Sequence, residues 1–393
     1  MTVAARSVLL LALAFAAATA CKRTPEAGPL TKGEKVETPR ARAAYVTNNG
    51  SDSLSVLDRD GDRVQTIAVD IDPKAHEAPH HLAVDANAGA AYVALAFPAP
   101  PGKTKDPHKA HGNADDPGKL AWLDLDTLAI VAARDVDENP GDVVLTHDRT
   151  RLLVTHYDMK RAMDVAMAGG NAGAMAATLQ VWDAKTRTKI EERAVCVAPH
   201  GIAVTADDRA AMIACYGSDE LAVVDLTLPG LPTARYPLGA QQGVPGAPHF
   251  GPYSATLSPD GARVIVASLE GADVRVFDRA KKAFLPERTM TLGARVMMPD
   301  FVTDHAIVAP LQGPDGVARL DVDTGVVEAR VAMAADVCQS PHAARRSKDG
   351  RVYVVCEGDH KAPGAVIEID PVTLAVKRRW IVGVYPDGIA FGE

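Results

Sequence analysis

The chain has 393 residues with a formal net charge of −8, and 47% of its residues are hydrophobic. This is an ordinary globular composition, long enough for two or three small domains or for one large all-β ring. The negative charge and the lack of a clear basic cluster argue against a nucleic-acid partner, which would need Lys and Arg to neutralise phosphates.

The first residues have the pattern of an export signal. Arg6 precedes an apolar run from Val8 to Phe15, and small residues then lead to Cys21. The run is too short to span a bilayer, which favours a signal peptide over residues 1–20. The letters ATAC that end at Cys21 resemble a lipobox, and the resemblance implies a diacylated Cys21. Plain secretion after cleavage nearby is the alternative.

Residues 21–40 are polar, charged and Pro-bearing without periodicity, so we expect the lipidated Cys21 to be followed by a flexible tether. No second hydrophobic span follows. We therefore expect a protein of the cell envelope, on the periplasmic side or the cell surface, that touches the membrane through its lipid anchor only.

A repeated unit fills residues 41–393. Short β-rich runs such as SLSVLD, TLQVWD and AVIEID end in an Asp, and a turn that this Asp can cap through its side chain follows. A second β run precedes each copy, a third run often opens with Pro and His or Asp, and a fourth closes the unit. The seven aspartates are Asp58, Asp124, Asp183, Asp225, Asp278, Asp321 and Asp370.

Four short strands repeated every 40 to 60 residues indicate a β-propeller, here with seven blades. The first unit lacks its first strand, whereas Tyr385 to Phe391 (YPDGIAF) at the end of the chain has that strand's pattern. We therefore expect an all-β, seven-bladed propeller whose C-terminal strand pairs into the first blade and closes the ring.

The phrases AAYVTNNGSDSLSVLD and PHGIAV, with repeated DG turns, resemble the YVTN-type β-propeller repeat family of bacterial surface and periplasmic proteins. The resemblance covers about residues 43–393. It implies the propeller fold but little about function, because propellers of this type serve as binding platforms, polymer-associated proteins and occasional enzymes. The streptogramin-lyase propellers share the PHGI phrase.

Histidines gather on one predicted face, the top, which carries the loops that lead into the first strand of each blade. His residues mark these positions in blades two, four, five and seven, so they should rim the central channel. Imidazoles that converge there can hold copper or zinc. The candidate metal ligands are His80, His81, His200, His249 and His342. For any one of them a structural role, bonding neighbouring loop backbone, is the alternative.

The cysteines repeat this placement. Cys196 and Cys338 each precede a His by four residues, and Cys215 and Cys356 end the second strands of the same two blades. In an exported protein this predicts two disulfides within blades, Cys196–Cys215 and Cys338–Cys356. Thiolate ligation of a metal is the alternative. Residues 97–119 and 157–178 form long insertions on the same face, and the Met residues of the second suggest a short amphipathic helix.

Three functions fit these features. We expect first a binding module whose top face takes a ligand, an envelope protein or a polymer. The second is a copper or zinc protein, or a redox protein, that uses the channel-mouth histidines. The third is a lactonase- or lyase-type enzyme with acids such as Glu270, Glu357 and Asp359 around a divalent cation. No nucleophile motif such as GxSxG is present, so the sequence favours binding over catalysis.

Overall fold

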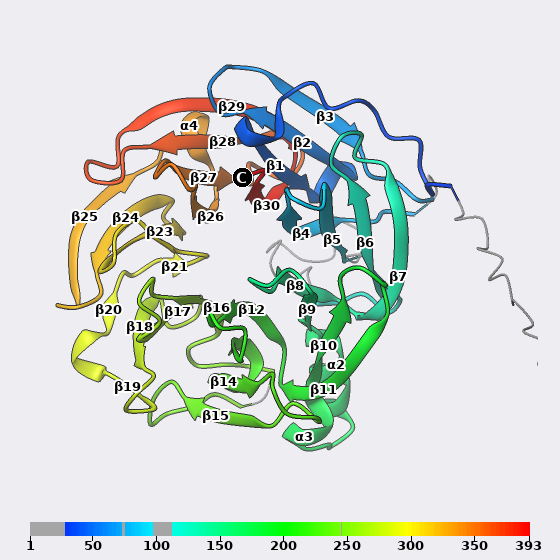
Figure 1. The fold of residues 1–393 in the computed structure, drawn as a ribbon. Coiled ribbons are helices and arrows are strands. Elements are labelled where there is room, and N and C mark those ends of the chain that lie inside the picture. The colour runs from blue at the N-terminus through cyan, green and yellow to red at the C-terminus, as the bar shows by residue number, and fades with distance from the viewer. Residues whose placement is uncertain (1–27, 73–74, 97–111, 245) are drawn as a thin grey trace, which may run out of the picture.

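The computed structural model describes residues 28–72, 75–96, 112–244 and 246–393, which form a ring of seven β-sheets around a central axis (Figure 1). Neighbouring strands in every sheet are antiparallel, and each sheet has four or five of them. The predicted seven-bladed propeller is therefore confirmed. The predicted signal peptide and Cys21 lie outside the described residues.

The first blade joins the two ends of this ring. Its order is β3-β2-β1-β30, with β1 (Ala43–Asn48), β2 (Ser53–Asp58), β3 (Val64–Ala68) and β30 (Pro386–Phe391). Because β30 is the innermost strand and pairs with β1, the predicted closure by the C-terminal strand is confirmed. Closure removes two sheet edges that would otherwise be unpaired.

The other blades follow in chain order from the centre outward. Blade two is β4 (Pro79–Asp85), β5 (Ala90–Leu95), β6 (Pro117–Asp124) and β7 (Ile130–Glu138); blade three is β8 (Pro140–Leu145), β9 (Arg151–His156), β10 (Ala177–Asp183) and β11 (Lys189–Cys196); blade four is β12 (Pro199–Val204), β13 (Ala210–Cys215), β14 (Glu220–Asp225) and β15 (Thr233–Pro237). Blade five is β16 (Pro252–Leu257), β17 (Arg263–Ser268), β18 (Asp273–Asp278), β19 (Ala283–Phe284) and β20 (Met290–Thr291); blade six is β21 (Arg295–Val296), β22 (Asp300–Phe301), β23 (Ala306–Gln312), β24 (Gly316–Asp321) and β25 (Val326–Ala332); blade seven is β26 (Pro341–Arg346), β27 (Val352–Cys356), β28 (Pro363–Ile369) and β29 (Val376–Val384).

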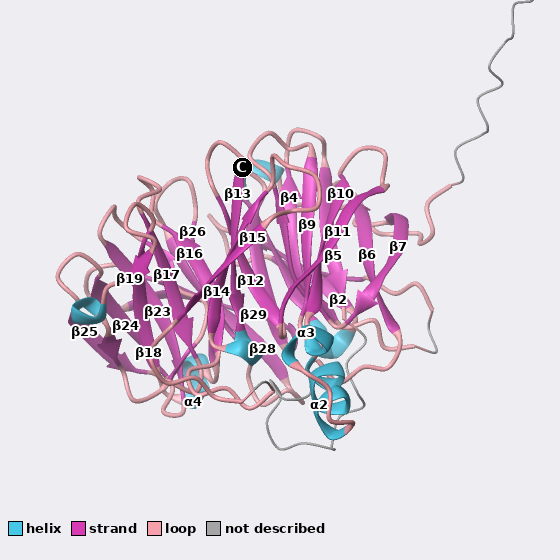
Figure 2. Cartoon of the chain, turned by 90° about the horizontal axis from the view of Figure 1, so that it is seen from below, coloured by secondary structure: helices cyan, strands magenta, loops and turns pink. Residues whose placement is uncertain are grey.

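Helical segments are short. The α-helices described are α2 (Met159–Met167), α3 (Ala172–Met175) and α4 (Ala335–Cys338), and the 3-10 turns are η1 (Arg40–Arg42), η2 (Asn49–Ser51), η3 (Tyr216–Ser218) and η4 (Pro286–Arg288). Asp158 caps α2 by accepting the Arg161 amide at 2.9 Å. In Figure 2 the three α-helices lie on one face of the disc, which is the face predicted as the top.

The repeated Asp acts as predicted. The carboxylate at the end of each third strand accepts backbone amides of the turn that follows, as when Asp183 accepts from Lys185 and Thr186 and Asp370 from Val372 and Thr373. The turn amides of the other five copies bond in the same way. A side chain that satisfies its own turn fixes where each strand reverses.

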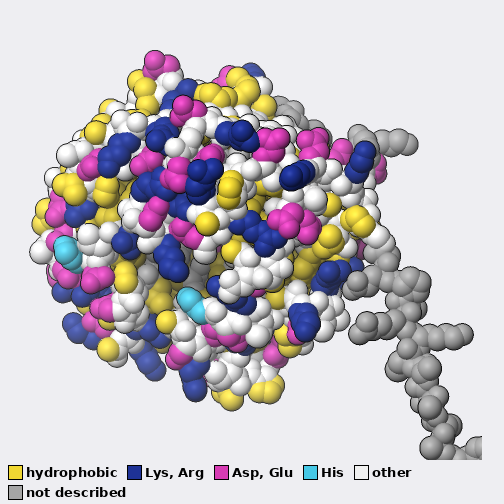
Figure 3. All heavy atoms as spheres, turned by 45° about the horizontal axis from the view of Figure 1, so that its top comes forward, with side chains coloured by type: hydrophobic (Ala, Val, Ile, Leu, Met, Phe, Trp, Pro, Cys, Tyr) yellow, Lys and Arg dark blue, Asp and Glu magenta, His cyan; other side chains and the backbone are white. Residues whose placement is uncertain are grey.

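The core is divided into layers between adjacent blades. Ile265 of blade five packs with Ile307 and Leu320 of blade six in one buried cluster, and Val56 of blade one packs with Val93 and Leu123 of blade two in another. Each sheet thus buries both faces against its neighbours, and only the outermost strands, such as β25, are largely exposed. On the face drawn in Figure 3, basic and acidic side chains intermingle.

The first described residues pack along blade two. The Leu30 amide donates to Ile130 O, and the Glu34 and Val36 amides donate to Thr127 O and Asp126 O, each at 2.7 Å. The second half of the segment predicted as a tether therefore contacts the propeller. Among the described residues, no helix is long and apolar enough to cross a membrane.

Both predicted disulfides are confirmed. Cys196 bonds to Cys215 with Cα atoms 5.8 Å apart, and Cys338 bonds to Cys356 with Cα atoms 5.1 Å apart. The four cysteines are buried. Structural disulfides persist in oxidising compartments, which indicates an extracytoplasmic location.

Candidate metal centre

The innermost strands of most blades begin with the same backbone conformation. A residue with positive φ precedes a proline, as at Ala78 (φ 48°), Ala198 (φ 49°) and Ser340 (φ 51°), and a bulge in the pairing follows that proline. Positive φ at a residue other than glycine carries strain that the surrounding structure must offset. Bulges re-aim side chains, and the residues at these bulges are the ones that converge on the channel.

The ring of side chains around the channel mouth is polar and closed to solvent. Its members are at most 6% exposed although most of them can carry charge. They are His80 and His81 from blade two, Asp142 from blade three, His200 from blade four, Tyr253 from blade five, His342 from blade seven and Asp387 from the closing strand of blade one. Buried ionisable groups persist only when they are paired or hold an ion.

His80 faces both a carboxylate and another imidazole. Its Nδ1 contacts Asp387 Oδ2, and its Nε2 lies 3.4 Å from His200 Nε2. A metal with nitrogen bonds of about 2.0–2.1 Å in tetrahedral geometry holds adjacent nitrogens about 3.4 Å apart. The His80–His200 spacing therefore equals the edge of a tetrahedral site.

His81 is held in one tautomer. Its Nδ1 donates to Asp142 Oδ1 at 2.9 Å, and Asp142 also accepts the Val143 amide at 2.8 Å and the Ile202 amide at 2.9 Å. The opposite nitrogen, Nε2, is buried without a hydrogen-bond partner and lies 4.0 Å from Asp387 Oδ1. His81 thus presents a lone pair to the channel from a ring whose other side is fixed.

His342 closes the ring on the opposite side. Its Nδ1 donates to Glu357 Oε1 at 2.5 Å, and its Nε2 forms an ion pair with Asp387 Oδ1 at 2.9 Å. Glu357 also accepts from His360 Nε2 at 2.8 Å, and the His360 ring stacks on Tyr385. Carboxylates thus contact the Nδ1 atoms of His80, His81 and His342, the arrangement that orients metal-binding imidazoles in proteins.

Threonines on neighbouring blades fix the backbone of these histidines. Thr155 Oγ1 donates to His200 O at 2.6 Å, and Thr47 Oγ1 donates to His80 O. Thr47 also accepts the amide of Gly388, beside Asp387, at 2.8 Å. The backbones of His80 and His200 are therefore each held by the blade before their own, so the geometry of the cluster depends on closure of the whole ring.

The charges of the cluster follow from burial and mutual contact. Burial opposes the ionisation of Asp387 and of Asp142, but the adjacent histidines outweigh it and hold the pKa of each carboxyl below its usual range. Burial, together with His80, lowers the pKa of His81, so that ring is neutral. Burial alone would lower the pKa of His342 too, but Asp387 and Glu357 raise it to about 10.

Two overlapping sets of ligand atoms meet the spatial requirement for a metal ion. The nitrogens of His80, His81 and His200 lie within 4.8 Å of one another, as do ligand atoms of His81, His342 and Asp387. His81 belongs to both sets, and one imidazole nitrogen binds one ion. The geometry therefore suits a single ion with nitrogen ligands and one carboxylate beside it, the donor set of copper or zinc.

The structure brings together four of the five predicted ligands. His249 lies apart: it is exposed at the rim, and its ring packs edge-on against Phe250. The position in blade five that corresponds to Pro-His elsewhere is Pro252-Tyr253, four residues beyond Pro248-His249. Asp142 and Asp387 are not among the ligands predicted from the sequence. The Pro-Gly-Asp and Pro-Asp-Gly starts of β8 and β30 carry the signal that could have found them.

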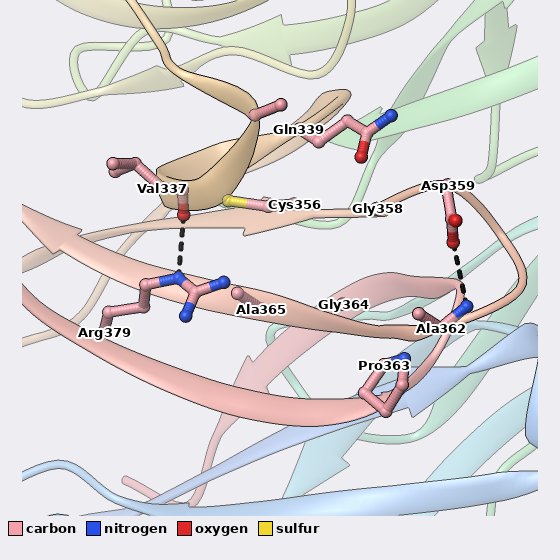
Figure 4. Close-up of a pocket in the computed structure, with 11 residues that line it drawn as sticks. Val337, Gln339, Cys356, Gly358, Asp359, Ala362, Pro363, Gly364, Ala365 and Arg379 are labelled. Carbon is pink, nitrogen blue, oxygen red and sulfur yellow. Dashed lines mark hydrogen bonds between the residues drawn. The ribbon is translucent and has the colours of Figure 1, made fainter.

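The three acids proposed for catalysis do not form one group. Glu357 is buried against His342, whereas Glu270 is exposed and accepts a hydrogen bond from the Tyr216 hydroxyl at 3.0 Å. Asp359 caps a turn and lines an open pocket of about 140 Å³ in blade seven (Figure 4). Cys356 and Arg379 line the same pocket, and the Arg379 Nε donates to Val337 O at 2.9 Å.

Comparison with known proteins adds to the fold but not to the site. No family model matches the chain, and no curated protein matches its sequence. Among solved structures, a functionally unknown protein from Desulfotomaculum acetoxidans is 12% identical with a TM-score of 0.63, over 89% of this chain and 98% of that one. A putative 6-phosphogluconolactonase from Bacteroides fragilis is 13% identical with a TM-score of 0.62, over 91% of this chain and 99% of that one.

A streptogramin B lyase is also similar, at 13% identity and a TM-score of 0.56, over 82% of this chain and 93% of that one. Likeness at such identities shows the architecture alone. The protein is a seven-bladed β-propeller, a fold that serves both binding modules and enzymes, so its chemistry depends on its own side chains.

Proposed function

We propose that this protein is an extracytoplasmic, lipid-anchored β-propeller that binds one copper or zinc ion at the top of its central channel. His80, His81 and His200 supply nitrogen ligands, and the Asp387 carboxylate lies beside them. The observation that carries the proposal is His81 Nε2, a buried lone pair without a hydrogen-bond partner, on a ring that Asp142 orients toward three other imidazoles.

Electrostatics supports this assignment. Ionised Asp142 and Asp387 sit in a water-excluded ring, so a divalent cation there is attracted to two negative charges. Because Asp387 accepts from His80, and Asp142 from His81, their Nδ1 atoms carry the protons. The Nε2 atom of His81 then carries a lone pair that faces the cluster, an arrangement that a cation stabilises.

Metal content tests the proposal. The protein is produced in a secreting host and purified in buffers without chelators. The metal content per chain is then obtained from elemental mass spectrometry and the protein concentration. We expect about one equivalent of copper or zinc per chain, because preformed ligand sets of this kind bind tightly. The variants H81A and H200A should lose that metal, while H249A, which removes an exposed histidine from the same face, should keep it.

Folding of each variant is checked by its thermal transition. Wild-type protein that arrives metal-free and binds neither copper(II) nor zinc(II) on addition contradicts the proposal. Metal that persists in the folded H81A variant would also contradict the proposal, because His81 belongs to both ligand sets.

A second role is binding of a ligand, envelope protein or polymer at the top face. The open pocket in blade seven supports it, since Asp359 and Arg379 offer both charges beside apolar Cys356 and Pro363 (Figure 4). A pull-down with envelope polymers, repeated with R379A, tests this role. The repeated strand pattern also supports membership of the YVTN-type repeat family.

A further inference from the structure

Aromatic rings lead away from the histidine cluster in an unbroken line. The His200 ring stacks on Tyr253 with centroids 3.9 Å apart and an angle of 24° between the planes. Tyr157 packs edge-on against both rings, at 5.2 Å from His200 and 6.2 Å from Tyr253. These are the spacings of aromatic pairs in direct contact.

The line continues to the protein surface. Tyr157 packs against Tyr216 with centroids 5.3 Å apart, and the Tyr216 hydroxyl donates to Glu270 Oε1 at 3.0 Å. Tyr157 and Tyr216 are only 5% and 6% exposed, whereas Glu270 is exposed. The three tyrosines come from blades three, four and five, so the line exists only in the assembled ring.

We propose that these rings carry single electrons between the channel centre and the surface at Glu270, and that the bound ion is therefore copper. This inference rests on the proposed function. In the step, one electron passes from an external donor to Cu(II), which becomes Cu(I), while the donor is oxidised by one electron. No bond forms or breaks and no proton needs to move.

Two features of the site support an electron route. The histidines of the cluster are at most 4% exposed, so a protein donor cannot touch the ion directly. Electronic coupling falls steeply across gaps, and π systems in contact leave the smallest gaps. An electron route needs a redox-active ion, which copper is and zinc is not.

The surface end of the route defines the kind of donor. Glu270 places a negative charge directly on the hydroxyl that ends the line, so a donor with a cationic surface is attracted there. Hexaammineruthenium(II), a cationic one-electron reductant, is a small-molecule probe with this chemistry.

The experiment measures reduction of the copper(II)-loaded full chain by hexaammineruthenium(II) in a stopped-flow instrument. Replacing a ring by an aliphatic side chain, in Y157L and Y216L, should slow reduction by about tenfold or more, equivalent to a barrier higher by about 1.4 kcal/mol. Y157F and Y216F keep the ring and should keep the wild-type rate. E270Q should slow reduction at low salt and less so at high salt.

Y236L is the matched control, because Tyr236 packs on Phe277, away from this line, and its loss should leave the rate unchanged. Each variant is checked for copper content and thermal stability. Copper-loaded, folded Y157L and Y216L that are reduced at the wild-type rate overturn the electron route while the metal site stands. If the protein binds no copper, the proposed metal site is wrong, and the electron route is wrong with it.

Discussion

The contact between Asp142 and His81 can be weakened without removing a metal ligand. In D142N the side chain keeps its size, but only one of its two terminal atoms is still an oxygen. The N–H groups that bond to two carboxylate oxygens in the wild type must then share one acceptor. The carboxylate accepts His81 Nδ1 and the Val143 amide at one oxygen and the Ile202 amide at the other. Keeping the amide oxygen toward His81 turns the new NH₂ group toward the Ile202 N–H.

Two effects of D142N follow from this geometry. One buried donor loses its acceptor, which costs about 1–3 kcal/mol of folding free energy. His81 keeps its tautomer but loses a charged acceptor, so its Nε2 becomes a weaker ligand. Loss of such an orienting carboxylate typically lowers metal affinity by about 10–100-fold.

Affinity is measured by competition with a coloured chelator, and stability by thermal unfolding of the metal-free protein. The control is D208N, because Asp208 accepts His147 Nδ1 at the same 2.9 Å, but His147 is an exposed residue of a turn between strands. D208N should leave metal affinity unchanged. Equal affinities for wild type and D142N would refute the claim that Asp142 orients a ligand.

Three further predictions concern the rest of the chain. Mass mapping without reductant should find the Cys196–Cys215 and Cys338–Cys356 peptides linked, and the double variant C196A/C215A should lose about 3 kcal/mol of stability, the value expected for a closed loop of this size; four free thiols would contradict the pairing. Hydrogen bonds from the following turns lower the pKa values of Asp183, Asp225, Asp278 and Asp370. Groups of this kind add stability above their unfolded pKa and lose it as the pH falls through the lowered folded value, so the melting temperature should drop below about pH 4; a flat profile down to pH 2 would exclude a contribution from these turns. Radiolabelled palmitate fed to the producing cells should label the wild type and not C21A, whereas label in neither would favour plain secretion.

The sequence determined the fold because the signals of a propeller blade are local. The Asp that ends each third strand bonds to amides two and three residues later, so each turn can be recognised in any one copy, and seven copies give the number of blades. The cysteine pairs could be predicted for the same reason, because each disulfide joins two residues at the same end of one blade.

The candidate site could be predicted only in part. Pro-His at the start of a strand identified His80, His200 and His342, because the repeat fixes their place in the ring. The same dipeptide occurs at His249, but there the chain runs three residues further before β16 begins, so His249 lies apart from the other four histidines. Asp142 and Asp387 went unrecognised because an Asp near a turn is common, and nothing local distinguishes one that faces a channel.

Only the tertiary structure decided what these residues can do together. His80 and Asp387 are separated by 307 positions, and His81 and Asp142 by 61, so their contacts depend on how the blades close into a ring. The surroundings of His81 Nε2 likewise come from several blades, and so do the ring contacts from His200 to Tyr216. Strand periodicity sets which face of its own blade a side chain occupies, whereas its partners across the channel depend on the closed ring.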